Sequence, residues 1–147
     1  MDPIRFLIRG FDYDLWANRQ WLGALAGFRD LERVHRVMEH MLEAQRIWLE
    51  RCGVLAPAPD DNVSMSDLFL IYSRTWISLV EGMDLNEPIT YQNLRGEEFT
   101  QPLGDIVLHV LNHGTYHRGH LRGLAESEGN ASFPETDMIL FLRERIG

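Results

Sequence analysis

Apolar residues recur at helical spacing along most of this chain, and helix-breaking residues separate the stretches in which they do. The spacing predicts a first helix from about residue 2 or 3 to about residue 26, because Pro3 suits the first turn of a helix and Gly27 suits its end. A second helix is predicted over 30–52, where the broad apolar stripe indicates heavy burial. Gly53 and the stretch APAPDDN then end the helical pattern.

The pattern changes twice in the middle of the chain. A third helix is predicted to begin at Ser64 or Ser66, either of which suits an N-cap, and to end near Gly82. Between residues 88 and 102, ITYQN and EEFTQ flank LRG, which is typical of a short β-hairpin with Gly96 in its turn.

Two further helices complete the prediction. The fourth runs from about Leu103 to Glu128, and the fifth, which is short, begins after Pro134 and reaches Arg145. These elements predict an all-α fold: a four-helix bundle with one small β-hairpin and a short C-terminal helix. The hairpin and APAPDDN lie in different connections, so simple up-down order does not follow. We expect residues 1–147 to form a single domain with one core.

Composition narrows the classes of partner. The chain has 14 Lys plus Arg against 22 Asp plus Glu, a formal charge of −8 that argues against nucleic acid and anionic membrane surfaces. The only cysteine, Cys52, excludes an intrachain disulfide and a cysteine zinc cluster. The N-terminal stretch lacks a basic region, and no apolar run approaches the ~20 residues of a membrane span. We therefore expect no signal peptide, no nucleic-acid partner, no membrane partner and a cytoplasmic location.

Four of the six histidines lie in HVLNHGTYHRGH, residues 109–120. At about 100° per residue they fall within roughly 80° of one another on a helix. The outermost two lie ~16 Å apart along the axis, so one metal ion cannot bind all four. The candidate chelating pairs are His109/His113 and His113/His117, both at i,i+4, and His117/His120 at i,i+3 is the weaker third candidate. Gly114 and Gly119 in the same helix indicate either close approach of another element or space left open for a ligand.

A third ligand has to come from another helix, where His35 and His40 are available. They point about 140° apart. Polar residues surround His35, whereas the apolar face of the helix flanks His40, so His40 is the better candidate. Three histidines leave an open coordination position, as in catalytic metal sites, and imidazole suits Zn, Ni, Fe and Cu. The alternative is a bundle with no metal, whose histidines pack in the core or face solvent.

Two familiar metal motifs do not fit. The stretch HGTYH has histidines at i and i+4 but lacks the glutamate that HExxH metalloproteases use as a base. Di-iron bundles require two ExxH motifs and further carboxylates, whereas this chain has one, from Glu32 to His35, on the polar side of its helix.

Three motifs together carry a resemblance to a known family. With WAN at 16–18, His40 followed by Trp48, and NHGTYHRG at 112–119, the chain resembles the DinB/YfiT-like superfamily of damage-inducible four-helix proteins. The resemblance covers nearly the whole chain. It implies a metal near the middle of the bundle, held by His40, His113 and His117, and so selects one of the pairs that spacing left open. His120 stands where this family often has glutamine.

The resemblance also implies a function. Members with known activity are metal-dependent enzymes that use low-molecular-weight thiols, as S-transferases or isomerases, and several are homodimers. We therefore expect a small-molecule substrate, a divalent metal (Zn, Ni or Fe), a low-molecular-weight thiol and a homodimer. Tyr116 and Arg118, near the histidines, are candidate catalytic residues that orient substrate or stabilise charge, although a packed tyrosine and a surface arginine are the blander interpretations.

Other interpretations remain open at this point. Asp12 and Asp14 could orient a ligand histidine, but a solvated first helix explains them better. The same metal could activate water in a hydrolase, with a nearby carboxylate as base. The protein could also be a metal-binding or ligand-binding module without catalysis.

Overall fold

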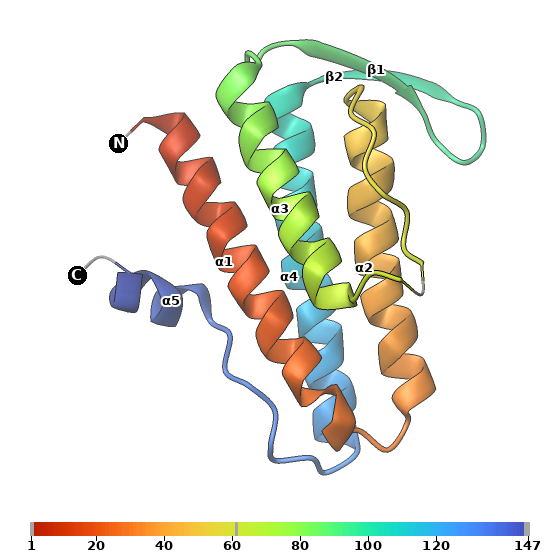
Figure 1. Cartoon of the computed structure of the whole chain (residues 1–147), viewed down its shortest axis with the longest axis vertical. Coiled ribbons are helices and arrows are strands. Elements are labelled where there is room, and N and C mark those ends of the chain that lie inside the picture. Colours follow the sequence, from red (N-terminus) through yellow and green to blue (C-terminus); the bar gives the residue numbers. More distant parts are fainter. Residues whose placement is uncertain (1, 61, 146–147) are drawn as a thin grey trace.

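The computed structural model describes residues 2–60 and 62–145 and confirms a mostly α-helical fold with one β-hairpin (Figure 1). A short 3₁₀ turn, Leu25–Gly27, continues the first helix. The helices are α1 (Pro3–Ala24), α2 (Leu31–Arg51), α3 (Met65–Gly82), α4 (Leu103–Ser127) and α5 (Met138–Arg145), and the strands are β1 (Pro88–Gln92) and β2 (Glu98–Pro102).

The four long helices form a closed ring. Each of α1 and α2 packs against both α3 and α4. The connection that follows α2 runs back along the length of the bundle, so α2 and α3 point in the same direction (Figure 1). The hairpin then crosses the end of the bundle and returns the chain to the start of α4 (Figure 1). The two crossing connections therefore replace simple up-down order.

Local chemistry fixes where these elements begin and turn. The carboxylate of Asp30 accepts a hydrogen bond from the backbone N–H of Arg33 at 3.1 Å and caps α2. The hydroxyl of Ser64 does the same for α3, because it accepts from the N–H of Asp67 at 3.1 Å. Gly96 adopts φ of +80° in the hairpin turn, which confirms its predicted place.

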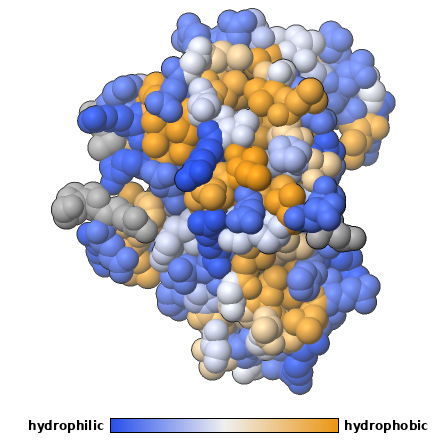
Figure 2. All heavy atoms as spheres, viewed as in Figure 1, coloured by the Kyte–Doolittle hydropathy of each residue, from blue (hydrophilic) through white to orange (hydrophobic). Residues whose placement is uncertain are grey.

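One core runs through the four long helices. The rings of Phe11 and Trp76 stack at 5.7 Å between their centroids and join α1 to α3. A smaller cluster, in which Phe141 packs on Tyr13 and Trp16, holds α5 against α1. The largest fully buried side chains are Trp21, Trp76, Tyr72, Phe11, Phe69, Met38 and Met41. On the face shown in Figure 2, apolar side chains reach the surface in separate patches that hydrophilic residues divide.

The fifth helix begins later than predicted. Residues 134–137 stay non-helical, and α5 starts at Met138. Thr136 explains the delay, because its hydroxyl accepts a hydrogen bond from the indole N–H of Trp21 at 3.0 Å and its carbonyl accepts from the hydroxyl of Tyr13. Among the described residues, no helix is both long and apolar enough to cross a membrane.

Candidate metal centre

Three histidines from two helices meet on one side of the bundle. His40 comes from α2, and His113 and His117 come from α4. Their candidate ligand nitrogens all lie within 4.8 Å of one another, and within the described residues no other group of three or more His, Cys, Asp or Glu side chains gathers in this way. The rings of His40 and His117 lie 4.6 Å apart, and those of His113 and His117 lie 4.3 Å apart. We call these three residues the histidine triad.

The spacing of the triad suits a metal ion. The Nε2 atoms of His113 and His117 lie 3.0 Å apart. In a tetrahedral site with metal–nitrogen bonds of ~2.0–2.1 Å, neighbouring ligand nitrogens lie roughly 3.3 Å apart. His40 is exposed, so its ring has room to rotate toward the other two. The three histidines are thus positioned to bind a metal ion.

The surroundings of the triad keep its α4 histidines uncharged. Burial, together with the neighbouring His117, His40 and His109, lowers the pKa of His113 to about 4. Burial and the nearby His40 and His120 also lower the pKa of His117. Both rings are therefore neutral at neutral pH, which is the form that binds metals. The Nδ1 atom of His117 is buried and has no hydrogen-bond partner among the described residues.

The remaining histidines lie outside the triad. His109 packs its ring edge-on against Trp48, at 5.2 Å between centroids, and its ring lies 5.7 Å from that of His113. His120 and His35 are exposed. Of the three pairs that helical spacing allowed, the structure thus brings His113 and His117 together with a third histidine.

Aromatic residues and a cation extend from the triad toward the hairpin. The guanidinium of Arg51 lies 4.3 Å from the ring centre of Trp48 and 4.9 Å from that of Tyr91, which belongs to β1. Arg51 also donates a hydrogen bond to the carbonyl of Gln92 at 3.1 Å. The hairpin therefore fixes an arginine and two aromatic rings on the side of the bundle that carries the histidines, a feature that the sequence did not reveal.

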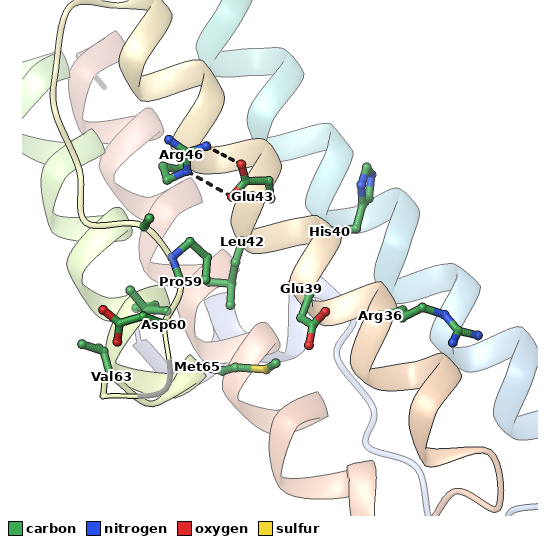
Figure 3. A pocket seen from close by; sticks show the side chains of 12 residues that line it. Arg36, Glu39, His40, Leu42, Glu43, Arg46, Pro59, Asp60, Val63 and Met65 are labelled. Carbon is green, nitrogen blue, oxygen red and sulfur yellow. Dashed lines mark hydrogen bonds and ion pairs between the residues drawn. The ribbon is translucent and has the colours of Figure 1, made fainter. Parts of the chain in front are cut away.

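A pocket of about 710 Å³ lies on the side of α2 that faces the connection to α3 (Figure 3). The residues that line it come from α2, from the connection that follows it and from the start of α3, and they include Leu42, Met65 and the ion-paired Glu43 and Arg46. His40 stands on the rim, and its ring extends toward α4 rather than into the pocket (Figure 3). The pocket therefore lies beside the triad and does not enclose it.

The two candidate catalytic residues lie in contrasting places. Tyr116 is 72% exposed, and its ring meets that of His117 at 5.2 Å and nearly a right angle. Arg118 is only 3% exposed, and one of its terminal nitrogens donates to Asp14 Oδ1 at 2.6 Å and to Asn18 Oδ1 at 2.7 Å. Tyr116 thus stands next to the triad, whereas Arg118 binds α1. Their predicted roles toward a substrate stay predictions.

The sequence missed the partner of Arg118. Asp14 is 4% exposed, so the expectation of a solvated first helix is wrong at this position, whereas Asp12 is exposed. One signal pointed to the contact: a Cβ on Gly114 would lie 2.3 Å from Asp14 Oδ1, which is the close approach that a glycine in a helix indicates. At Gly119, by contrast, no described atom other than those of its chain neighbours and its own helix backbone lies within 4 Å of the Cβ position, so that glycine faces open space.

The chain is similar to known proteins over most of its length. A family model described as the DinB family matches residues 11–144. Protein DinB of Bacillus subtilis (strain 168) is 26% identical to the chain, over 93% of this chain and 94% of that protein. No solved structure matches the chain.

Proposed function

The chain belongs to the DinB family, and from this premise we propose that it is a metal-binding protein whose ligands are His40, His113 and His117. The observation that carries the proposal is the meeting of three imidazoles within 4.8 Å, two of them held neutral by burial. The half-buried rings of His113 and His117 bring their Nε2 atoms to 3.0 Å from each other, and a shared cation would stabilise this close approach. Zn, Ni or Fe suits such a donor set.

The chemistry proposed for this site is thiol-dependent. A divalent ion held by these three neutral ligands would lower the pKa of a thiol or water bound at a remaining coordination position and so would supply a nucleophile at neutral pH. We propose that this position takes a low-molecular-weight thiol, and that the protein is an S-transferase or isomerase for a small electrophilic molecule.

Residues around the triad supply the proposed substrate site. The hydroxyl of Tyr116 is on the exposed ring beside His117 and can donate a hydrogen bond to a bound molecule. Trp48, Tyr91 and Arg51 offer flat rings and a positive charge to an aromatic or anionic substituent. The homodimer and the cytoplasmic location that we expect from the sequence remain part of this proposal.

Metal analysis tests the ligand set. The protein is purified without a histidine tag and without added metal, as the parent and as a His113→Ala, His117→Ala double variant. A His35→Ala, His109→Ala double variant is the matched control, because it removes the same number of histidines outside the triad. We expect about one divalent ion per chain in the parent and the control, and none in the triad variant. A parent that holds no metal, and that Zn, Ni or Fe does not stabilise, would refute the proposal.

Thiol dependence tests the reaction. The metal-loaded parent is incubated with small electrophiles, with and without cellular thiols, and the consumption of electrophile is measured. Turnover that requires a thiol, and that the triad variant loses, supports the S-transferase or isomerase proposal. Turnover without any thiol would indicate a hydrolase instead. Tight metal binding with no turnover in either condition would indicate a binding module.

A further inference from the structure

We propose that Asp14 is a positioning residue for the histidine triad and acts on it through Arg118 and Gln45. This inference rests on the proposed function, because the triad matters here as a metal site. Asp14 lies on α1, which contributes no histidine to the triad, but its buried carboxylate is bonded to both helices that do. In the bundle of Figure 1, α4 packs against both α1 and α2.

Three hydrogen bonds converge on this carboxylate. Oδ1 accepts from a terminal nitrogen of Arg118 at 2.6 Å, and Oδ2 accepts from the amides of Asn18 at 3.1 Å and Gln45 at 3.3 Å. All four side chains are buried. We call these residues the Asp14 cluster. A buried carboxylate that carries a full ion pair holds its partners in a defined arrangement, because leaving either charge unpaired is costly.

The partners of Asp14 lie close to the metal ligands along the chain. Arg118 directly follows His117, and Gly114 directly follows His113. The missing side chain of Gly114 lets α4 approach so closely that a Cβ there would lie 2.3 Å from Asp14 Oδ1. On α2, Gln45 lies five residues beyond His40, or ~7.5 Å along the helix axis. The cluster therefore fixes both triad helices within about two turns of their ligands.

Metal binding is sensitive to such a constraint. Ligand atoms must lie within about 0.2 Å of ideal metal–ligand distances. A helix that rotates or slides carries its histidines with it, and on α4 the ligands stand on the turn that Arg118 anchors. Outer residues that hold ligands in place typically change metal affinity by about 10- to 100-fold when they are mutated. Asp14 would hold the ligands in place in the same way, although it is bonded to Arg118 of α4 and not directly to a ligand histidine.

Cobalt binding to an Asp14→Asn variant tests the inference, because the amide keeps the shape of the carboxylate and removes its charge. Val80→Ala is the matched control: Val80 is 1% exposed in the core on α3, which carries no triad histidine, so its loss destabilises the fold without touching the cluster. We expect Asp14→Asn to weaken Co²⁺ binding about tenfold or more and to alter the d–d absorption spectrum. We expect Val80→Ala, at a comparable loss of thermal stability, to change neither. Equal cobalt affinities and spectra in the two variants would overturn the inference.

A second measurement needs no metal. Nitroxide labels at the exposed positions Glu39 on α2 and Asn112 on α4, in a Cys52→Ser background, report the separation of these helices by pulsed electron resonance. We expect the distance distribution to shift or broaden in Asp14→Asn and to stay unchanged in Val80→Ala. An unchanged distribution in Asp14→Asn would contradict the inference.

A further variant, Gln45→Leu, tests the inference if Asp14→Asn folds poorly. Gln45→Leu removes only the link from the cluster to α2, and it should change the label distance and the cobalt affinity in the same direction, by a smaller factor. A folded Gln45→Leu that matches the parent in both would overturn the link through α2. If the parent bound no cobalt, the proposed function would fail, and the label distances would still decide whether Asp14 fixes α2 against α4.

Discussion

Replacing Gly114 with alanine should destabilise the protein, although alanine is the better helix former. Gly114 lies in the middle of α4, where a new Cβ would stand 2.3 Å from Asp14 Oδ1 and 2.9 Å from a terminal nitrogen of Arg118. Both distances are below those of real carbon contacts, and the atoms that they meet form a buried ion pair. The ion pair must therefore separate, or α4 must move away from α1.

The opposing contributions to the free energy of unfolding can be compared. Alanine in place of glycine in a helix interior gains about 1 kcal/mol. Breaking a buried ion pair costs roughly 3–5 kcal/mol when a charge stays buried without its partner. The net loss is then about 2–4 kcal/mol. For a chain of this size each 1 kcal/mol lowers the melting temperature by about 3 °C, so we expect a decrease of about 6–12 °C.

The assay is thermal and urea denaturation of the metal-free protein, followed by far-UV circular dichroism. Gly123→Ala is the control, because it is the same substitution in the same helix at a position where the Cβ meets no described atom within 4 Å beyond its chain neighbours and its own helix backbone. We expect it to stabilise the protein by up to about 1 kcal/mol. The two substitutions should therefore have opposite signs. A Gly114→Ala protein as stable as the parent would show that the contact between α1 and α4 is looser than we describe.

Two further predictions concern the histidines. The metal-free protein should lose stability as the pH falls from about 6.5 to 4, because the folded state holds the pKa of His113 at about 4, below its unfolded value, so the unfolded state takes up the proton first. The loss is at most about 3 kcal/mol, measurable by urea denaturation across this pH range, and a His113→Gln variant should show a flatter profile; identical profiles would contradict the cause we assign. Separately, His109→Ala should keep the zinc stoichiometry of the parent in a calorimetric titration, whereas His40→Ala should weaken zinc binding; the reverse order would move the ligand set along α4.

The helices and the hairpin could be predicted because their signals are local. The stop at Gly82, the cap at Ser64 and the turn at Gly96 depend on the chemistry of single residues and their immediate neighbours. The start of the fifth helix could not be predicted in this way. Thr136 holds its segment in a non-helical conformation through hydrogen bonds to side chains more than a hundred positions away, and no local sequence pattern indicates these bonds.

In the candidate site, too, the features within one helix could be predicted and the contacts between helices could not. A helical wheel placed four histidines on one face of α4, but it describes one helix and contains no information about what a neighbouring helix presents. Spacing therefore left three pairs open, and only the structure shows that His40 lies across from His113 and His117. The same limitation hid the Asp14 cluster, because Asp14 and Arg118 are 104 residues apart and each resembles a surface residue in its own helix.

Tyr116 and Arg118 lie on different faces of α4, which limits how they could act together. Two residues apart in a helix, they project about 200° from each other, so they cannot face one substrate together. If Arg118 left Asp14 to bind an anionic group, the carboxylate that stays buried would cost roughly 3–5 kcal/mol. Arg51 faces no such cost, because it is half-buried and rests on aromatic rings on the triad side of the bundle. A variant at Arg118 should therefore change metal affinity through the position of α4. A variant at Arg51 should instead change how strongly the protein prefers charged over neutral substrates.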